Sequence, residues 1–183
     1  SVDVLTADVA NLAQIKSVVD NIEANSAPLR GVIHGAAVIE DALASNMSFE
    51  LFTKVLRPKI RGAVYLNQLT RHLPLEFFYM TASMSNVMAL NGQTHYNAAN
   101  NFLDALAVLR RRQGLSAMSA SLTAISGAGF VTRNKTVERL LGAVGVVPVH
   151  VEEIVELMEV LNNNEYTTPI ISHKNFVSDF KGT

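Results

Sequence analysis

The sequence lacks cysteine, and its positive and negative charges almost cancel. Without cysteine there can be no disulfide, no cysteine-ligated zinc and no thiol catalysis. The 15 Lys and Arg residues and the 16 Asp and Glu residues leave a net charge of -1, so the positive charge typical of nucleic-acid and membrane-surface binders is missing. No apolar run approaches the roughly 18 residues of a membrane-spanning helix. We therefore expect a cytoplasmic protein with no nucleic-acid partner and no membrane association.

Three further patterns are missing. The five histidines show none of the i, i+4 pairing of a zinc-binding helix, so we expect no metal site. The N-terminal segment has neither the basic start nor the apolar core of a signal peptide. It also lacks the G-x-G-x-x-G turn that brings backbone amides against a dinucleotide pyrophosphate. We expect residues 1–183 to form a single domain, the C-terminal portion of a larger unit whose first strands and glycine-rich turn lie upstream.

Short β-branched runs alternate with longer amphipathic segments along the chain. We expect strands at residues 2–9, 31–34, 77–81, 117–122 and 169–172. We expect helices at residues 12–22, 48–66 with a kink or break at Pro58, 94–113 with Phe102, Leu103, Leu106 and Leu109 inward, 136–142 and 151–162. Strands that alternate with helices form a parallel sheet, because each parallel connection must cross over one face. The expected fold class is α/β: a doubly wound, Rossmann-like parallel sheet that lacks the first strands and the glycine-rich turn.

Four polar residues are expected near the carboxyl ends of the strands. Ligands of such folds bind beyond the carboxyl ends of the strands. Tyr96 and Asn100 are one helical turn apart on the same face, and Ser83 follows the preceding strand, 13 residues before Tyr96. Lys59 comes directly after Pro58 in the long helix. Each of these residues alone is more often structural, but the four spacings together are specific enough to indicate an active site.

The segments around these residues resemble a known family. They are Arg57–Ala63, Gly92–Asn100 with Ser83, and Arg110–Leu115, and they are similar to ketoreductase domains of polyketide synthases and animal-type fatty acid synthases. These domains belong to the short-chain dehydrogenase superfamily, whose usual pattern has Lys four residues after Tyr and Asn on the earlier helix. Here the two are exchanged, as in the synthase ketoreductases, which separates this sequence from a free-standing dehydrogenase.

The resemblance implies an NADPH-dependent enzyme. It would reduce a β-ketoacyl thioester, carried on the phosphopantetheine arm of an acyl carrier protein, to a β-hydroxyacyl thioester, beside neighbouring synthase domains. Tyr96 would donate the proton and Ser83 would hold the carbonyl oxygen. Lys59 would lower the pKa of Tyr96 and hold the nicotinamide ribose, and Asn100 would orient Lys59 or a relay water.

The resemblance also implies residues that contact the two ligands. Those expected on the cofactor are Asp8, Val9, His34, Gly35, Ala36, Lys59 and Tyr96. Those expected on the substrate are Asp41 and Gln93. The tripeptide Ile39-Glu40-Asp41 resembles the Leu-Asp-Asp signature of one stereochemical class of bacterial ketoreductases, whereas the opposite class has a Trp where this sequence has Met88. We therefore expect the D-3-hydroxy product.

One position departs from the family pattern. Thr123 follows Leu122 where the family usually has Gly, and a β-branched residue would strain the loop if the position needs a positive φ. This departure favours an alternative, a non-catalytic structural half-domain that braces a synthase. The complete set of Ser, Tyr, Lys and Asn favours the enzyme, because a brace needs none of them.

Overall fold

The computed structural model describes residues 2–25, 27–88, 90–127, 147–163 and 166–173. Its helices are α1 (Leu12–Asn25), the 3-10 turn η1 (Ala44–Asn46), α2 (Phe49–Thr70), α3 (Ser85–Met88), α4 (Thr94–Arg112) and α7 (Val151–Asn163). Its strands are β1 (Gly31–His34), β2 (Phe77–Ser83), β3 (Met118–Leu122), β4 (Ile125–Ser126), β5 (Val149–His150) and β6 (Ile170–Ile171). The expected helix at 136–142 lies outside the described residues.

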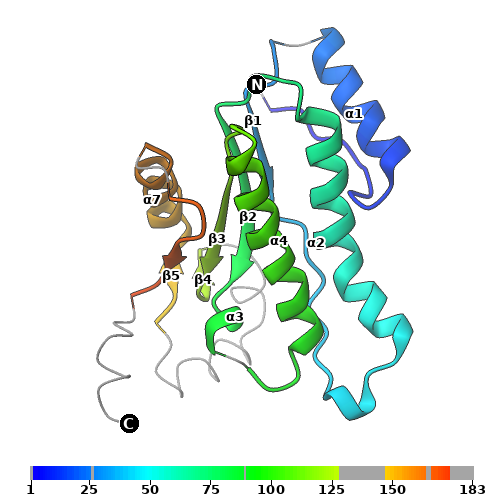
Figure 1. Ribbon diagram of the computed structural model, residues 1–183, viewed down its shortest axis with the longest axis vertical. Coiled ribbons are helices and arrows are strands. Elements are labelled where there is room, and N and C mark those ends of the chain that lie inside the picture. The colour runs from blue at the N-terminus through cyan, green and yellow to red at the C-terminus, as the bar shows by residue number, and fades with distance from the viewer. Residues whose placement is uncertain (1, 26, 89, 128–146, 164–165, 174–183) are drawn as a thin grey trace.

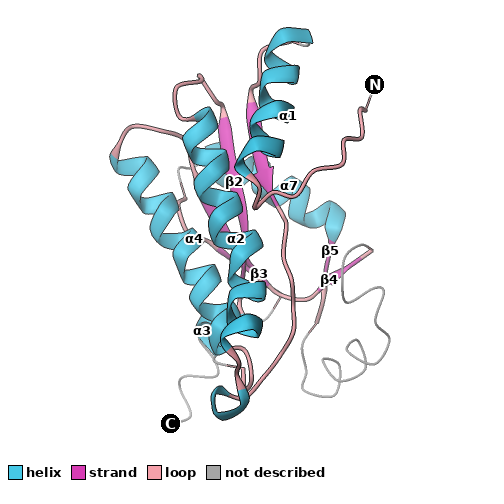
Figure 2. Cartoon of the chain, turned by 90° about the vertical axis from the view of Figure 1, so that its right-hand side faces the viewer, coloured by secondary structure: helices cyan, strands magenta, loops and turns pink. Residues whose placement is uncertain are grey.

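The main sheet has four strands in the order β1-β2-β3-β6, and every pairing is parallel. A separate two-stranded parallel pair joins β4 to β5. Helices α2 and α4 cover one face of the main sheet and α7 lies on the other (Figure 1). Helix α1 lies beside α2 on the same face (Figure 2). The expected parallel sheet with helices on both faces is confirmed.

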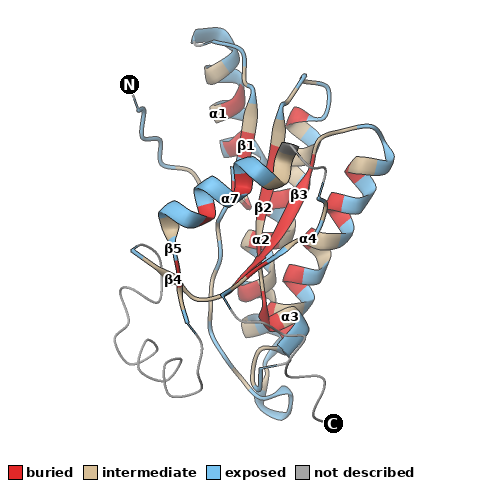
Figure 3. Cartoon of the chain, turned by 90° about the vertical axis from the view of Figure 1, so that its left-hand side faces the viewer, coloured by how far each residue is buried: buried red, intermediate tan, exposed pale blue. Residues whose placement is uncertain are grey.

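Two apolar clusters fill the spaces between the layers, and buried positions concentrate on β2, β3 and the inner sides of the helices (Figure 3). Successive residues of β2 alternate between the clusters, because neighbouring side chains of a strand point to opposite faces. Phe78 and Met80 pack toward α2 and α4, whereas Tyr79 packs toward α7. Leu103 and Leu106 of α4 are buried as expected, but Leu109 is 50% exposed and the neighbouring Arg110 is buried instead.

Local signals explain where the two long helices begin and end. The Ser48 side chain caps α2 by accepting a hydrogen bond from the Leu51 amide at 3.1 Å. The helix then continues through Pro58 without the expected break. Helix α4 ends in three arginines, which favour the negative end of the helix dipole, and Gly114 follows with a φ of +74°.

The expected strand at residues 2–9 is not formed. No described strand pairs with this segment, and Val2 and Val4 are 89% and 90% exposed. An extended segment becomes a strand only when its backbone amides and carbonyls find partners, which side-chain composition alone does not provide. Among the described residues, no helix is long and apolar enough to cross a membrane.

Candidate active site at the carboxyl edge of the sheet

The carboxyl ends of the parallel strands place three chain segments at one edge of the sheet. Strand β1 ends at His34, β2 at Ser83 and β3 at Leu122. The Met84 amide donates to the Leu122 carbonyl at 2.9 Å, so the chain leaves β2 beside the end of β3. Helix α4 packs on β2 and carries Tyr96 in its first turn. This is the edge at which the sequence predicts the active site.

Lys59 lies inside the protein beside Tyr96. Its side chain is 2% exposed, its Nζ donates to the Thr81 carbonyl at 2.6 Å, and the same Nζ is 5.4 Å from the centre of the Tyr96 ring. Burial lowers the pKa of Lys59 to about 8, although the nearby Asp104 charge opposes this effect. A group with a pKa near 8 is still mostly charged at pH 7, so Tyr96 has an ammonium beside its ring.

Tyr96 and Asn100 are both buried on the inner face of α4. Burial raises the pKa of Tyr96, the Asn100 carboxamide opposes that effect, and the Asp41 charge adds to it. The expected lowering of the Tyr96 pKa is therefore not seen, because burial outweighs the other influences. Asn100 Nδ2 donates to the Tyr96 carbonyl at 3.0 Å, while its buried Oδ1 has no partner among the described residues.

Ser83 belongs to a short hydrogen-bond chain that the sequence analysis did not anticipate. Its Oγ is 3.0 Å from Ser85 Oγ, which is 2.6 Å from Asn97 Oδ1. A hydroxyl has one proton, and Ser85 donates its proton to the nearer acceptor, the Asn97 amide oxygen. The Ser83 proton is then left for Ser85 or for a bound oxygen. The spacing of Ser85 and Asn97 carries no signal of this contact, because only the turn after β2 brings them together.

His34 does not face the sheet edge. Its side chain is 3% exposed and its Nε2 donates to the Lys59 carbonyl at 3.1 Å. Burial is the main cause that lowers the pKa of His34. The hydrogen bond to the Lys59 carbonyl opposes this effect and the Lys59 charge adds to it, and with a lowered pKa the imidazole is neutral at pH 7. Gly35 and Ala36 follow in the loop beyond β1, with Gly35 exposed and Ala36 half-buried.

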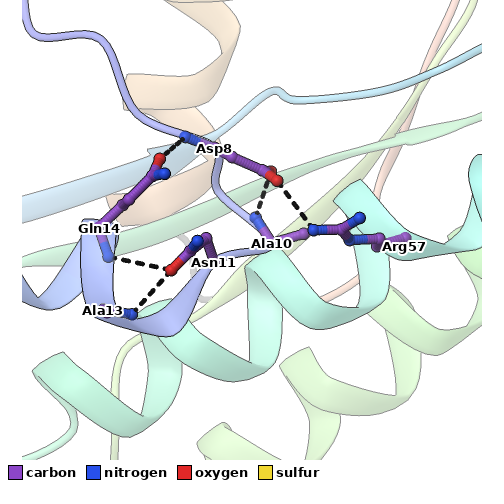
Figure 4. Close-up of polar contacts among 6 residues, drawn as sticks. All are labelled: Asp8, Ala10, Asn11, Ala13, Gln14 and Arg57. Atoms are coloured by element: carbon purple, nitrogen blue, oxygen red, sulfur yellow. Dashed lines mark hydrogen bonds and ion pairs between the residues drawn. The ribbon is translucent and has the colours of Figure 1, made fainter.

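Asp8 is exposed, and its side chain points toward Arg57 of α2 (Figure 4). Its carboxylate accepts from the Ala10 amide at 2.9 Å and pairs with Arg57 Nη2 at 3.0 Å. Val9 lies against α2, because a Cβ placed on Gly62 would come within 2.9 Å of Val9 Cγ2. An open groove of about 580 Å³ runs beside Asp8, between residues 8–10 and the first turns of α2.

The loop after β1 is fastened to the start of α4. Gln93 Nε2 is 3.1 and 3.2 Å from the two Asp41 carboxylate oxygens. His95 Nε2 donates to the Glu40 carbonyl at 2.8 Å, and His95 itself is buried. These contacts attach Asp41 and its neighbour Glu40 to Gln93 and His95, which lie three positions and one position before Tyr96. A second open groove, of about 610 Å³, is lined by residues of this loop and of α3 and α4.

Thr123 continues directly from β3. Its amide donates to the Ile171 carbonyl at 3.2 Å, so it extends the pairing between β3 and β6. Its buried hydroxyl oxygen has no partner in the described part of the chain. Within the same part of the chain, no group of three or more His, Asp or Glu side chains is arranged to hold a metal ion.

A family model described as the KR domain matches residues 1–127. The chain belongs to the KR domain family. This match contains Lys59, Ser83, Tyr96 and Asn100, and it ends just after Thr123.

Relatives of this KR chain are very large synthases. Trichosetin synthetase PKS-NRPS1 of Gibberella fujikuroi is 41% identical over 133 residues, which are 73% of this chain and 3% of that protein. Reducing polyketide synthase DEP5 of Alternaria brassicicola is 36% identical over 159 residues, which are 87% of this chain and 7% of that protein. The chain therefore spans only a small fraction of the curated relatives that it matches.

Solved ketoreductases share the fold of this KR chain. A ketoreductase from the first module of phoslactomycin biosynthesis in Streptomyces sp. HK803 matches with a TM-score of 0.86 and 29% identity, covering 94% of this chain and 40% of that one. A structure of A-type ketoreductases from a modular polyketide synthase matches with the same TM-score and 28% identity, covering 94% of this chain and 36% of that one. The likeness extends over nearly all of the chain.

Proposed function

We propose that this KR chain forms the C-terminal portion of a single ketoreductase domain in a polyketide synthase. It would reduce a β-ketoacyl thioester to a β-hydroxyacyl thioester in the cytoplasm, using NADPH. The observation that carries the proposal is the buried pair of Lys59 and Tyr96, with the ammonium 5.4 Å from the phenol ring. A buried charge beside a buried phenol is costly for folding, and such arrangements cluster at functional sites.

Tyr96 acts as the proton donor in this proposal. When NADPH is bound, it supplies the hydride that the carbonyl carbon receives. The carbonyl oxygen becomes an alkoxide, and the Tyr96 hydroxyl transfers its proton to that oxygen. Ser83 donates its own hydroxyl proton in a hydrogen bond to the same oxygen. This proton can be used there because the Ser85 hydroxyl acts as a donor to Asn97 Oδ1. The Lys59 ammonium stabilises the phenolate that remains, and Asn100 Oδ1 orients the water or ammonium that returns the proton.

The described residues fit a bound dinucleotide. An ammonium has three donors, and Lys59 uses one of them on the Thr81 carbonyl, so two remain for ribose hydroxyls. Asn100 Oδ1 is a buried acceptor without a partner among the described residues, as expected beside an absent polar group. Gly35 and Ala36 would line the cofactor beyond β1, with Asp8 and Val9 beside the adenine. His34 would act through Lys59, because its buried ring donates to the Lys59 carbonyl on α2.

The substrate would enter past Asp41 and Gln93. Their hydrogen bonds hold the loop after β1 against the first turn of α4, which also carries Tyr96. A thioester on the phosphopantetheine arm of an acyl carrier protein would pass this pair to reach the site. The relatives named as polyketide synthases and synthetases support a setting among neighbouring synthase domains.

Replacement of one tyrosine hydroxyl tests the proposal. In a ketoreductase domain that contains these residues, Tyr96→Phe should reduce ketone turnover by at least about a hundredfold, because only the proton donor is lost. NADPH affinity should change little. Tyr79→Phe is the matched control: Tyr79 is also buried, but its hydroxyl donates to the Met158 carbonyl at 3.3 Å on the opposite face of the sheet. Near-normal turnover of Tyr96→Phe would refute the catalytic assignment.

A further inference from the structure

Three segments of the chain meet in a closed ring of hydrogen bonds around Lys59. His34 Nε2 donates to the Lys59 carbonyl at 3.1 Å, and Lys59 Nζ donates to the Thr81 carbonyl at 2.6 Å. Thr81 Oγ1 donates to the His34 carbonyl at 3.3 Å and closes the ring. The three residues come from the end of β1, the middle of α2 and β2. The ring therefore fixes α2 relative to the sheet at the position of its lysine.

The sheet and the helix are both shaped to allow this ring. In the β1–β2 register His34 pairs with Met80, so Thr81 is the next residue along and its hydroxyl reaches the His34 carbonyl. On α2, a Cβ placed on Gly62 would meet His34 Cε1 at 2.8 Å. Only a residue without a side chain lets the imidazole lie this close to the helix.

We propose that His34 and Thr81 are positioning residues that hold the Lys59 ammonium beside the Tyr96 ring. The inference rests on the proposed function of Lys59 and Tyr96. A lysine side chain has four flexible methylene bonds, so burial alone does not choose one position for its ammonium. The backbone end of Lys59 is held by His34, and its Nζ end is held by the Thr81 carbonyl. The backbone carbonyl and the ammonium of Lys59 are thus tied to neighbouring strands of one sheet.

Paired substitutions separate positioning from simple packing. His34→Leu removes the donor and should reduce kcat by at least about tenfold. His34→Gln can place an amide nitrogen near the position of Nε2 and should stay within about threefold of wild type. Thr81→Val removes the hydroxyl at nearly constant shape and should reduce kcat about threefold, whereas Thr81→Ser should not. The KM for the thioester should be unchanged in all four variants, because none of these side chains is placed on the substrate side.

The same substitutions in a Lys59→Met background provide the deciding measurement. If His34 acts through Lys59, then His34→Leu should cost little once the ammonium is gone, because the two losses are not additive. An equal loss of kcat in both backgrounds would overturn the inference while leaving the proposed function intact. A wild-type kcat in both single variants, His34→Leu and Thr81→Val, would also overturn the inference.

A second readout needs no turnover. Lysine labelled with ¹³C at Cε reports the protonation of Lys59 by NMR, and the Lys59→Met spectrum assigns its signal. In His34→Leu the titration midpoint of Lys59 should fall by about half a pH unit or more, because the ammonium is no longer held against the Thr81 carbonyl that accepts its hydrogen bond. An unchanged midpoint would overturn the inference. Absence of ketone reduction by the wild-type domain would refute the proposed function, and this titration would still decide between a positioning ring and none.

Discussion

Replacing Lys59 with methionine should stabilise the protein while it slows ketone reduction strongly and leaves a measurable residual rate. Lys59 is 2% exposed, and burial lowers its pKa from 10.5 to about 8. At about 1.4 kcal/mol per pKa unit, keeping this group charged in the folded state costs about 3 kcal/mol at pH 7. Methionine has a similar shape and no charge, so the free energy of unfolding of Lys59→Met should rise by up to that amount. Gain in stability on loss of a buried charge is typical of functional sites.

The pH dependence of this difference provides the sharper test. The folded pKa lies below the unfolded one, so the cost is complete below pH 8 and disappears as the pH rises from 8 to 10.5. Urea unfolding should therefore show a difference of about 3 kcal/mol at pH 7 and about 1 kcal/mol at pH 9.5. Lys54→Met on the same helix is the control, because that ammonium is exposed and its pKa is raised by Glu40, so it does not titrate in this range. A lower stability of Lys59→Met, or a difference that does not change with pH, would refute the reasoning.

Two further substitutions and the stereochemistry of the product can be tested in the same domain. Arg110→Ala should lower the free energy of unfolding by about 3 kcal/mol, measured by urea unfolding, because the buried guanidinium donates to Asn67 Oδ1 at 2.6 Å and lies 4.0 Å from the centre of the Phe78 ring. Gly62→Ala should cost about 1–3 kcal/mol in the same assay, since its Cβ would collide with the His34 ring, and an unchanged stability would contradict the close approach. If Asp41 guides substrate entry, chiral chromatography of the reduced thioester should show mainly the D-3-hydroxy product, and mainly L product would contradict it.

The arrangement of the sheet could be predicted from the sequence because alternation of strands and helices leaves few solutions. Once the strands at Gly31–His34 and Phe77–Ser83 are parallel, their carboxyl ends share one edge, and residues that follow them must meet there. The helical spacing of Tyr96 and Asn100 then determines that both face the sheet. The same reasoning predicts that Lys59, a residue distant in the sequence, lies near Tyr96, and its Nζ is 5.4 Å from the centre of the Tyr96 ring.

Other features depend on contacts that spacing does not encode. Residues 2–9 have the composition of a strand, but no described strand supplies partners for their backbone groups. Arg110 is buried and Leu109 is exposed, the reverse of the expected pattern, because the Arg110 guanidinium donates to Asn67 and Ser116. The sequence pattern does not indicate these two acceptors. The ring of His34 donates to a backbone carbonyl of α2, a contact that the sequence does not indicate. Hydrogen bonds to backbone atoms leave no residue-type signature in the partner.

The protonation of the Lys59–Tyr96 pair suits reduction better than oxidation. Reduction starts from a phenol that still has a proton to give, whereas alcohol oxidation starts from a phenolate that can accept one. Burial raises the pKa of Tyr96 and so keeps the phenol protonated at neutral pH, while Lys59, with a pKa of about 8, remains mostly charged. The Asp104 carboxylate, which accepts from Ser119 Oγ at 2.6 Å, also favours the charged form of Lys59. In the proposed mechanism, the resting site would therefore combine a protonated phenol with a cation that stabilises the phenolate, which is the state that reduction of a ketone requires.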